Sequence, residues 1–189
     1  MLPDIDKHLC EVMPQVTPLR RRLLAEFLGG ISTRDAAGYV VAQVLGGAAG
    51  AVLANLMFAL PAIDASSRTR SSGSLWLAET VATFGLLLVV FGVVRSSRSS
   101  AAPFAVGAYI GAAYFFTAST SFANPAVTLG RTLSDTFAGI APASAPAFIV
   151  FQALGAGIAV VAIRELYPDI GKVAGSVVVP HQPEDVPAP

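Results

Sequence analysis

Long stretches without a charged residue are the feature that most restricts the fold of this chain. Residues 36–63, 99–130 and 136–163 contain no Asp, Glu, Lys or Arg. Roughly 20 apolar residues cross a bilayer core, so each stretch is long enough to do so. A shorter one, Thr80–Val94, is extended by an apolar turn that carries Trp76. We therefore expect an all-α integral membrane protein with four spans, at about 36–60, 74–94, 101–117 and 146–166.

A proline interrupts the longest uncharged stretch, in FANPAVTLGR at residues 122–131. Asn before Pro is a good helix start, because Asn caps free N–H groups and Pro at the first helical position loses no bonded donor. Irregular backbone at membrane depth must be covered by protein or line a cavity. We expect a re-entrant half-helix over about 124–137, in preference to the alternative of an extracellular turn.

Basic residues predict the orientation. They are concentrated before the first span, between the second and third spans (Arg95 and Arg98) and after the last span. By the positive-inside rule, both termini of this multi-pass protein are expected to be cytoplasmic, in the plasma membrane. The membrane domain should cover 20–167, after a polar tail at 1–19 and before a proline-rich, disordered tail at 168–189. Residues 20–31 are expected to form an interfacial amphipathic stub.

The chain also contains an internal repeat. Gln43 and Gly46 in the first span align with Gln152 and Gly155 in the last, at one constant offset. A second alignment pairs Glu26 with Glu79. Within the first span, Gly46 and Gly50 have the small-xxx-small spacing that lets another helix approach closely.

A helix that opens with Leu-Ala-Glu, an Asn-Pro-Ala loop that starts a short helix, and a later helix with Gln152 together resemble the aquaporin, or major intrinsic protein, family. The resemblance covers about residues 23–167. It implies six spans in two inverted repeats, with two Asn-Pro-Ala half-helices that meet at mid-membrane. This chain looks like the third to sixth spans with the second half-helix. We therefore expect a truncated aquaporin-like fold that lacks most of the first span, the second span and the first Asn-Pro-Ala loop.

The resemblance implies a channel for water or small neutral solutes, impaired by the loss of the first half-pore and conducting little or nothing as a monomer. The alternative is a non-conducting remnant or an assembly partner of full-length channels. An ion-coupled transporter is disfavoured, because the spans hold few ionisable groups. No nucleophile–base pair supports an enzyme. The expected partners are the lipid bilayer and other chains in a homo- or hetero-oligomer.

Other ligands are not expected. The formal net charge of zero gives no reason to expect nucleic acid. The single cysteine, Cys10, and two histidines in the tails, His8 and His181, make a metal site implausible. No cofactor is expected.

The candidate pore-lining residues follow from the same resemblance. The family has an Arg directly after the second Asn-Pro-Ala, where this chain has Val127. The position of a constriction His falls near Ala112, and the loop position three before the Asn is Ser121. These small or apolar side chains predict a wider, less polar constriction. The full candidate set is Asn124, Pro125, Ala126, Val127, Ser121, Ala112 and Arg131.

Two charged residues keep alternatives open. Arg131 lies one helical turn after Val127 and either replaces the missing arginine, or pairs with Asp135 or snorkels outward. Glu79 is a carboxylate within a span, which is a functional feature by default. The resemblance implies that Glu79 braces the re-entrant loop by accepting backbone hydrogen bonds, whereas a proton pathway is the other reading.

Overall fold

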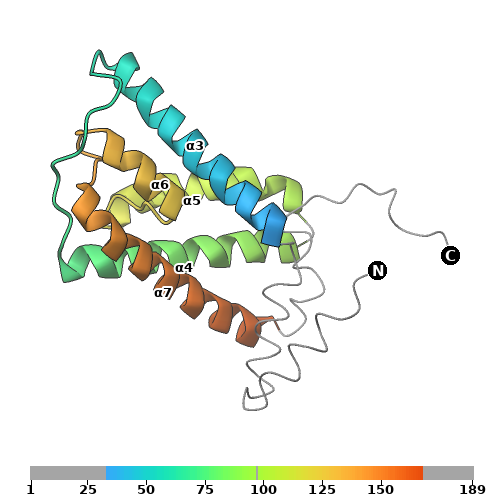
Figure 1. Ribbon diagram of the computed structural model, residues 1–189. Coiled ribbons are helices and arrows are strands. Elements are labelled where there is room, and N and C mark those ends of the chain that lie inside the picture. The colour runs from blue at the N-terminus through green and yellow to red at the C-terminus, as the bar shows by residue number, and fades with distance from the viewer. Residues whose placement is uncertain (1–32, 97, 168–189) are drawn as a thin grey trace, which may run out of the picture.

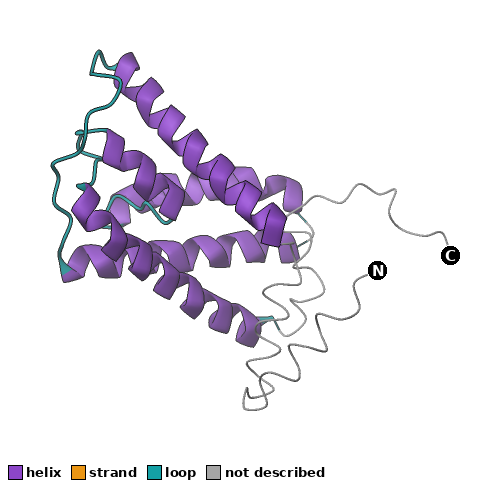
Figure 2. Ribbon diagram, viewed as in Figure 1, coloured by secondary structure: helices purple, strands orange, loops and turns teal. Residues whose placement is uncertain are grey.

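The computed structural model describes residues 33–96 and 98–167, and within them every regular element is helical (Figure 2). The expected tails at 1–19 and 168–189 and the stub at 20–31 lie outside the described residues. The order along the chain is shown in Figure 1. The elements are α3 (Thr33–Met57), α4 (Gly73–Arg95), η1 (Ser99–Ala101), α5 (Ala102–Phe116), α6 (Pro125–Gly130), η2 (Arg131–Leu133), η3 (Pro142–Ser144) and α7 (Ala145–Leu166).

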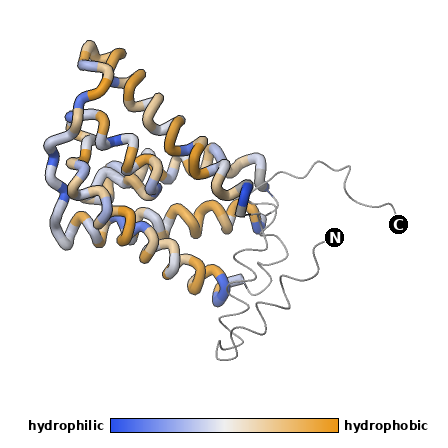
Figure 3. Tube along the Cα trace, in the orientation of Figure 1, coloured by the Kyte–Doolittle hydropathy of each residue, from blue (hydrophilic) through white to orange (hydrophobic). Residues whose placement is uncertain are grey.

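Three of the described helices, α3, α4 and α7, are long and apolar enough to cross a membrane. Most of their residues are hydrophobic by the hydropathy scale, and the start of α3 and the end of α7 are hydrophilic (Figure 3). The fourth expected span is shorter, because α5 has 15 residues, although η1 directly precedes it. The structure is thus that of an all-helical membrane protein, and four complete crossings stay a prediction.

Helices α4 and α7 pack along each other, and a glycine makes their contact close. A Cβ atom on Gly155 of α7 would collide with the backbone carbonyl group of Thr80 in α4. Thr80 Oγ1 in turn donates to the Phe151 carbonyl at 3.1 Å. The rings of Trp76 and Phe151 stack with centroids 5.3 Å apart. Tyr109 of α5 joins the same helix pair, since its hydroxyl donates to the Ala82 carbonyl at 3.0 Å.

Helix α3 packs mainly against α6 and the turn that follows it. A Cβ on Gly130 would lie 2.8 Å from the Gly47 carbonyl oxygen, and one on Gly47 would lie 3.2 Å from the Ala126 carbonyl oxygen. The prediction that Gly46 and Gly50 mediate the close approach is wrong for these contacts, since a Cβ on either would meet nothing within 4 Å. The close contact uses the adjacent glycine because that residue faces α6.

The half-helix is shorter than predicted. It begins at Pro125, but α6 and η2 together end at Leu133, short of Phe137. The carbonyls of Thr132 and Leu133 accept hydrogen bonds from the amides of Ser66 and Asp64 instead of from the next helical turn. The loop between α3 and α4 therefore takes over the helix end, and Ser134 is already extended.

Two charged side chains hold the loop between α3 and α4 against the segment after α6. Arg70 belongs to the loop, and Asp135 belongs to the segment. Arg70 is buried, and its guanidinium donates to the carbonyls of Gly139 (2.7 Å), Ser119 (3.0 Å) and Phe137 (2.7 Å). Asp135 accepts from the Ser67 amide at 2.9 Å, from the Ser67 hydroxyl, and from Ser66. The bond from the Ser67 amide, followed by that from its hydroxyl, lowers the pKa of the Asp135 carboxyl.

Candidate functional site

The start of α6 is built as the sequence predicts. Asn124 has extended backbone, and its Oδ1 accepts from the Ala126 amide at 2.8 Å. Its carbonyl accepts from the Thr128 amide at 3.0 Å, while Pro125 occupies the first helical position. Figure 1 shows that α6 runs toward the end where α3 stops and α4 starts, and its first turn lies against Gly47 of α3. Free N–H groups at a helix start carry partial positive charge, which here lies at the half-buried Asn124 and the exposed Pro125.

The loop that leads to Asn124 has an unusual backbone. Thr120, Ser121 and Ala123 all have positive φ, at 65°, 47° and 49°. Left-handed conformations cost residues with a side chain on the order of 1–2 kcal/mol each. Such a loop needs bonds from outside itself to persist.

Glu79 of α4 supplies these bonds. Its carboxylate is fully buried and accepts from the amides of Phe122 and Ala123, each at 3.0 Å. Gln152 Nε2 donates to the same carboxylate at 2.6 Å. This is the geometry expected of a bracing carboxylate, with all of its bonds directed at the loop and α7.

The two glutamines of the internal repeat both contact α6 or its cap. Gln152 of α7 also donates to the Thr128 hydroxyl at 2.9 Å. On the opposite side, Gln43 Oε1 accepts from Asn124 Nδ2 at 3.4 Å. The side-chain amide of Asn124 is therefore held by Gln43 and by the Ala126 amide, and the half-helix lies between equivalent positions of α3 and α7.

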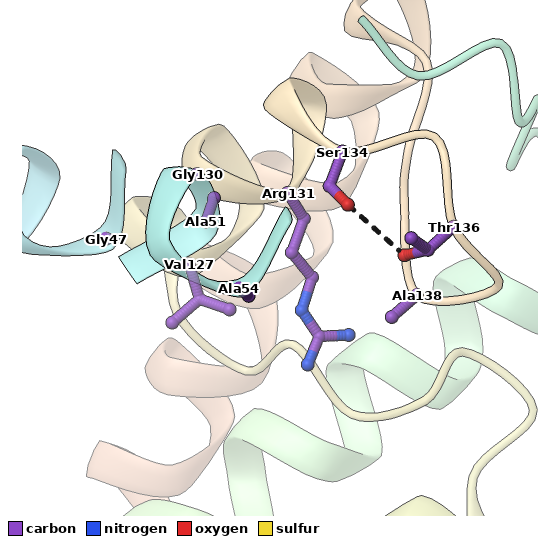
Figure 4. Close-up of a pocket in the computed structure, with 9 residues that line it drawn as sticks. All are labelled: Gly47, Ala51, Ala54, Val127, Gly130, Arg131, Ser134, Thr136 and Ala138. Atoms are coloured by element: carbon purple, nitrogen blue, oxygen red, sulfur yellow. Dashed lines mark hydrogen bonds between the residues drawn. The ribbon is translucent and has the colours of Figure 1, made fainter. Parts of the chain in front are cut away.

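A pocket of about 280 Å³ lies beside α6 (Figure 4). Helix α3 contributes small residues to the lining, and α6 and η2 contribute Val127 and Arg131. The segment after η2 lines another part of the pocket. Arg131 extends between Val127 and Ala138 and is the one charged side chain among the described residues that line the pocket. The complete lining is Gly47, Ala51, Ala54, Val127, Gly130, Arg131, Ser134, Thr136 and Ala138.

Arg131 does not pair with Asp135. Its guanidinium donates to Thr120 Oγ1 at 3.3 Å and to the Tyr114 hydroxyl. It also lies over the Phe122 ring, 4.3 Å from the centroid, a favourable cation–π distance. The side chain thus points back from η2 toward the loop before Asn124, onto the same pocket as Val127.

The other sequence candidates are not among the residues that line this pocket. Ala112 is exposed on α5, Pro125 is exposed at the start of α6, and Ala126 is buried against Gly47. Ser121 is buried, and its hydroxyl has no hydrogen-bond partner among the described residues.

Sequence reasoning missed four residues that hold this site, namely Gln43 as a partner of Asn124, Arg70, Tyr114 and Thr120. The repeat did mark Gln43, since it aligns with Gln152. The three carbonyl acceptors of Arg70 come from two distant loops, which one sequence cannot bring together. No sequence signal singled out Tyr114 or Thr120.

Comparisons with known proteins agree on one family. A family model described as major intrinsic protein matches residues 23–123. An aquaglyceroporin, AqpS of Rhizobium meliloti (strain 1021), is 49% identical over 138 residues, which are 73% of this chain and 59% of the relative. The chain therefore spans about three fifths of the length of the curated relative it matches. No solved structure matches the chain.

Proposed function

The chain belongs to the major intrinsic protein family, and on that basis we propose that it forms the wall of a membrane channel for water or small neutral solutes. The observation that carries the proposal is α6, a short helix that begins with a capping, half-buried Asn and lies beside a pocket. Its positive end opposes cations, and an Asn amide can donate to a passing oxygen. The aquaglyceroporin relative supports including polyols among the solutes.

In this proposal the pore-facing residues are Asn124, Val127 and Arg131, together with Ala112 and Ser121 from the neighbouring helix and loop. Glu79 acts by bracing the loop rather than by moving protons, because its bonds go to two amides and to Gln152.

Only 6% of the apolar window of α3 is buried, against 33% for α4. We propose that oligomerisation in the membrane covers part of this surface.

Solute flux in membrane vesicles tests the function. Vesicles from cells that produce the full chain keep whatever assembly it forms. Asn124→Asp retains a good helix cap but replaces the amide donor with a negative charge. Light scattering should show water or glycerol entry several-fold faster for the natural chain than for this variant at equal protein. Equal rates for both solutes would instead favour a non-conducting assembly partner.

We also propose that the protein is in the plasma membrane and, from the distribution of Arg and Lys, that both termini are cytoplasmic. In a Cys10→Ser background, Thr69→Cys lies in the exposed loop between α3 and α4, and Ser100→Cys lies in η1. An impermeant thiol reagent should label Thr69→Cys in intact cells and Ser100→Cys only after permeabilisation. Labelling of both in intact cells would contradict this topology.

A further inference from the structure

The positive charge of Arg131 stands alone in its pocket. The other lining residues are glycines, alanines, Val127, Ser134 and Thr136, none of which is charged. Asp135 is in the same segment, but its carboxylate accepts from Ser66 and Ser67. Within residues 33–96 and 98–167, no carboxylate forms an ion pair with Arg131. The charge is therefore not neutralised by a neighbour and acts on whatever enters the pocket (Figure 4).

The guanidinium is also fixed in place. Thr120 and Tyr114 accept two of its hydrogen bonds, and the Phe122 ring supports one face. On the same ring, Arg70 lies 5.2 Å from the centroid, with its own N–H groups bound to three carbonyls. Arg131 donates two hydrogen bonds to the described residues and so keeps N–H groups that no protein atom of these residues accepts. The Arg131 guanidinium therefore offers a solute both hydrogen-bond donors and a positive charge.

We infer that Arg131 determines the charge selectivity of this pocket: it repels cations and offers hydrogen-bond donors to neutral or anionic oxygen groups. The side chain at position 127 is aliphatic and supplies neither property. Tyr114, Thr120 and Phe122 act as positioning residues that hold the guanidinium toward the pocket. The inference rests on the proposed channel function for its biological meaning, but the charge in the pocket can be measured without any flux.

Thiol modification measures that charge. In the Cys10→Ser background, Ala138→Cys places a thiol on the pocket wall facing Arg131. The reaction rates of two methanethiosulfonates of similar size, one anionic (sulfonatoethyl) and one cationic (trimethylammonioethyl), are compared in membranes. Removing the charge with Arg131→Gln should lower the anionic-to-cationic rate ratio about five-fold or more, since a unit charge acts strongly over this distance in a partly buried site.

Three variants interpret the result. Arg68→Gln removes an exposed arginine from the α3–α4 loop, outside the pocket, and should leave the ratio nearly unchanged. Arg131→Lys keeps the charge and should keep most of the ratio. Arg131→Gln combined with Val127→Arg returns a charge to the same pocket and should restore the ratio. An unchanged ratio in Arg131→Gln, or an equal fall in Arg68→Gln, would overturn the inference. If Arg131→Gln lowers the anionic-to-cationic rate ratio but the natural chain gives no solute flux, only the channel function is refuted.

Discussion

Replacing Glu79 with leucine should be the most destabilising single change in the described part of the chain. It leaves the buried amides of Phe122 and Ala123 without an acceptor and removes one of two acceptors of Gln152 Nε2. An unsatisfied buried group costs about 1–3 kcal/mol, so the two amides together cost about 2–6 kcal/mol. The loop also loses the bonds that oppose its left-handed residues.

Thermal unfolding in detergent measures this loss, with the single tryptophan, Trp76, as a fluorescent reporter in the same helix. Glu79→Gln should fall between the natural chain and Glu79→Leu, because its amide oxygen accepts one backbone bond while its NH₂ group opposes the other. Glu165→Leu, at an exposed position in the last turn of α7, is the matched control. A Glu79→Leu midpoint equal to that of Glu165→Leu would show that the loop does not need the carboxylate.

The second large effect is expected at Gly155, and the repeat provides its control. Leucine at Gly155 would push α7 away from α4, because even a Cβ atom would lie 3.1 Å from the carbonyl carbon of Thr80. Backbone cannot move aside as a side-chain end can, and overpacking costs about 1–3 kcal/mol or more. The stacked rings of Trp76 in α4 and Phe151 in α7 should separate when α7 moves away.

Leucine at Gly46, the repeat-equivalent position, should change stability by only about 0.5 kcal/mol or less, since nothing lies within 4 Å of its Cβ position. Both variants are compared by thermal unfolding in the same detergent. Similar midpoints for the two would mean that α4 and α7 are not in close contact at Gly155.

The elements predicted best are those determined by local chemistry. Asn is a good helix cap and Pro a good first helical residue, and the structure has Asn124 and Pro125 in these roles. The end of the half-helix was misplaced because it depends on Asp64 and Ser66, which are distant in sequence and take the last carbonyls. Local pattern indicates where a helix can start, whereas a distant loop decides where this one stops.

The glycine contacts likewise depend on more than the local sequence pattern. Spacing alone favoured Gly46 and Gly50, but a spacing rule does not say which side of a helix meets the neighbour. Gly47 faces α6, and Gly130 faces it in return. Arg131 was left with two alternatives for a similar reason, since its acceptors Tyr114 and Thr120 come from a helix end and a loop that one sequence does not place next to η2.

The attachment of α3 through α6 has a consequence for biosynthesis. A ribosome completes α3, then α4 and α5, before the residues of α6 are made. Until then α3 lacks its main partner, so the translocon must release it into lipid on its own apolar sequence, which is the least hydropathic of the three long helices. A bulky residue at Gly130 should therefore leave α3 inserted in the membrane but not packed against α6. Quality-control proteases would then act on the loop after Met57, and insertion itself would be unaffected.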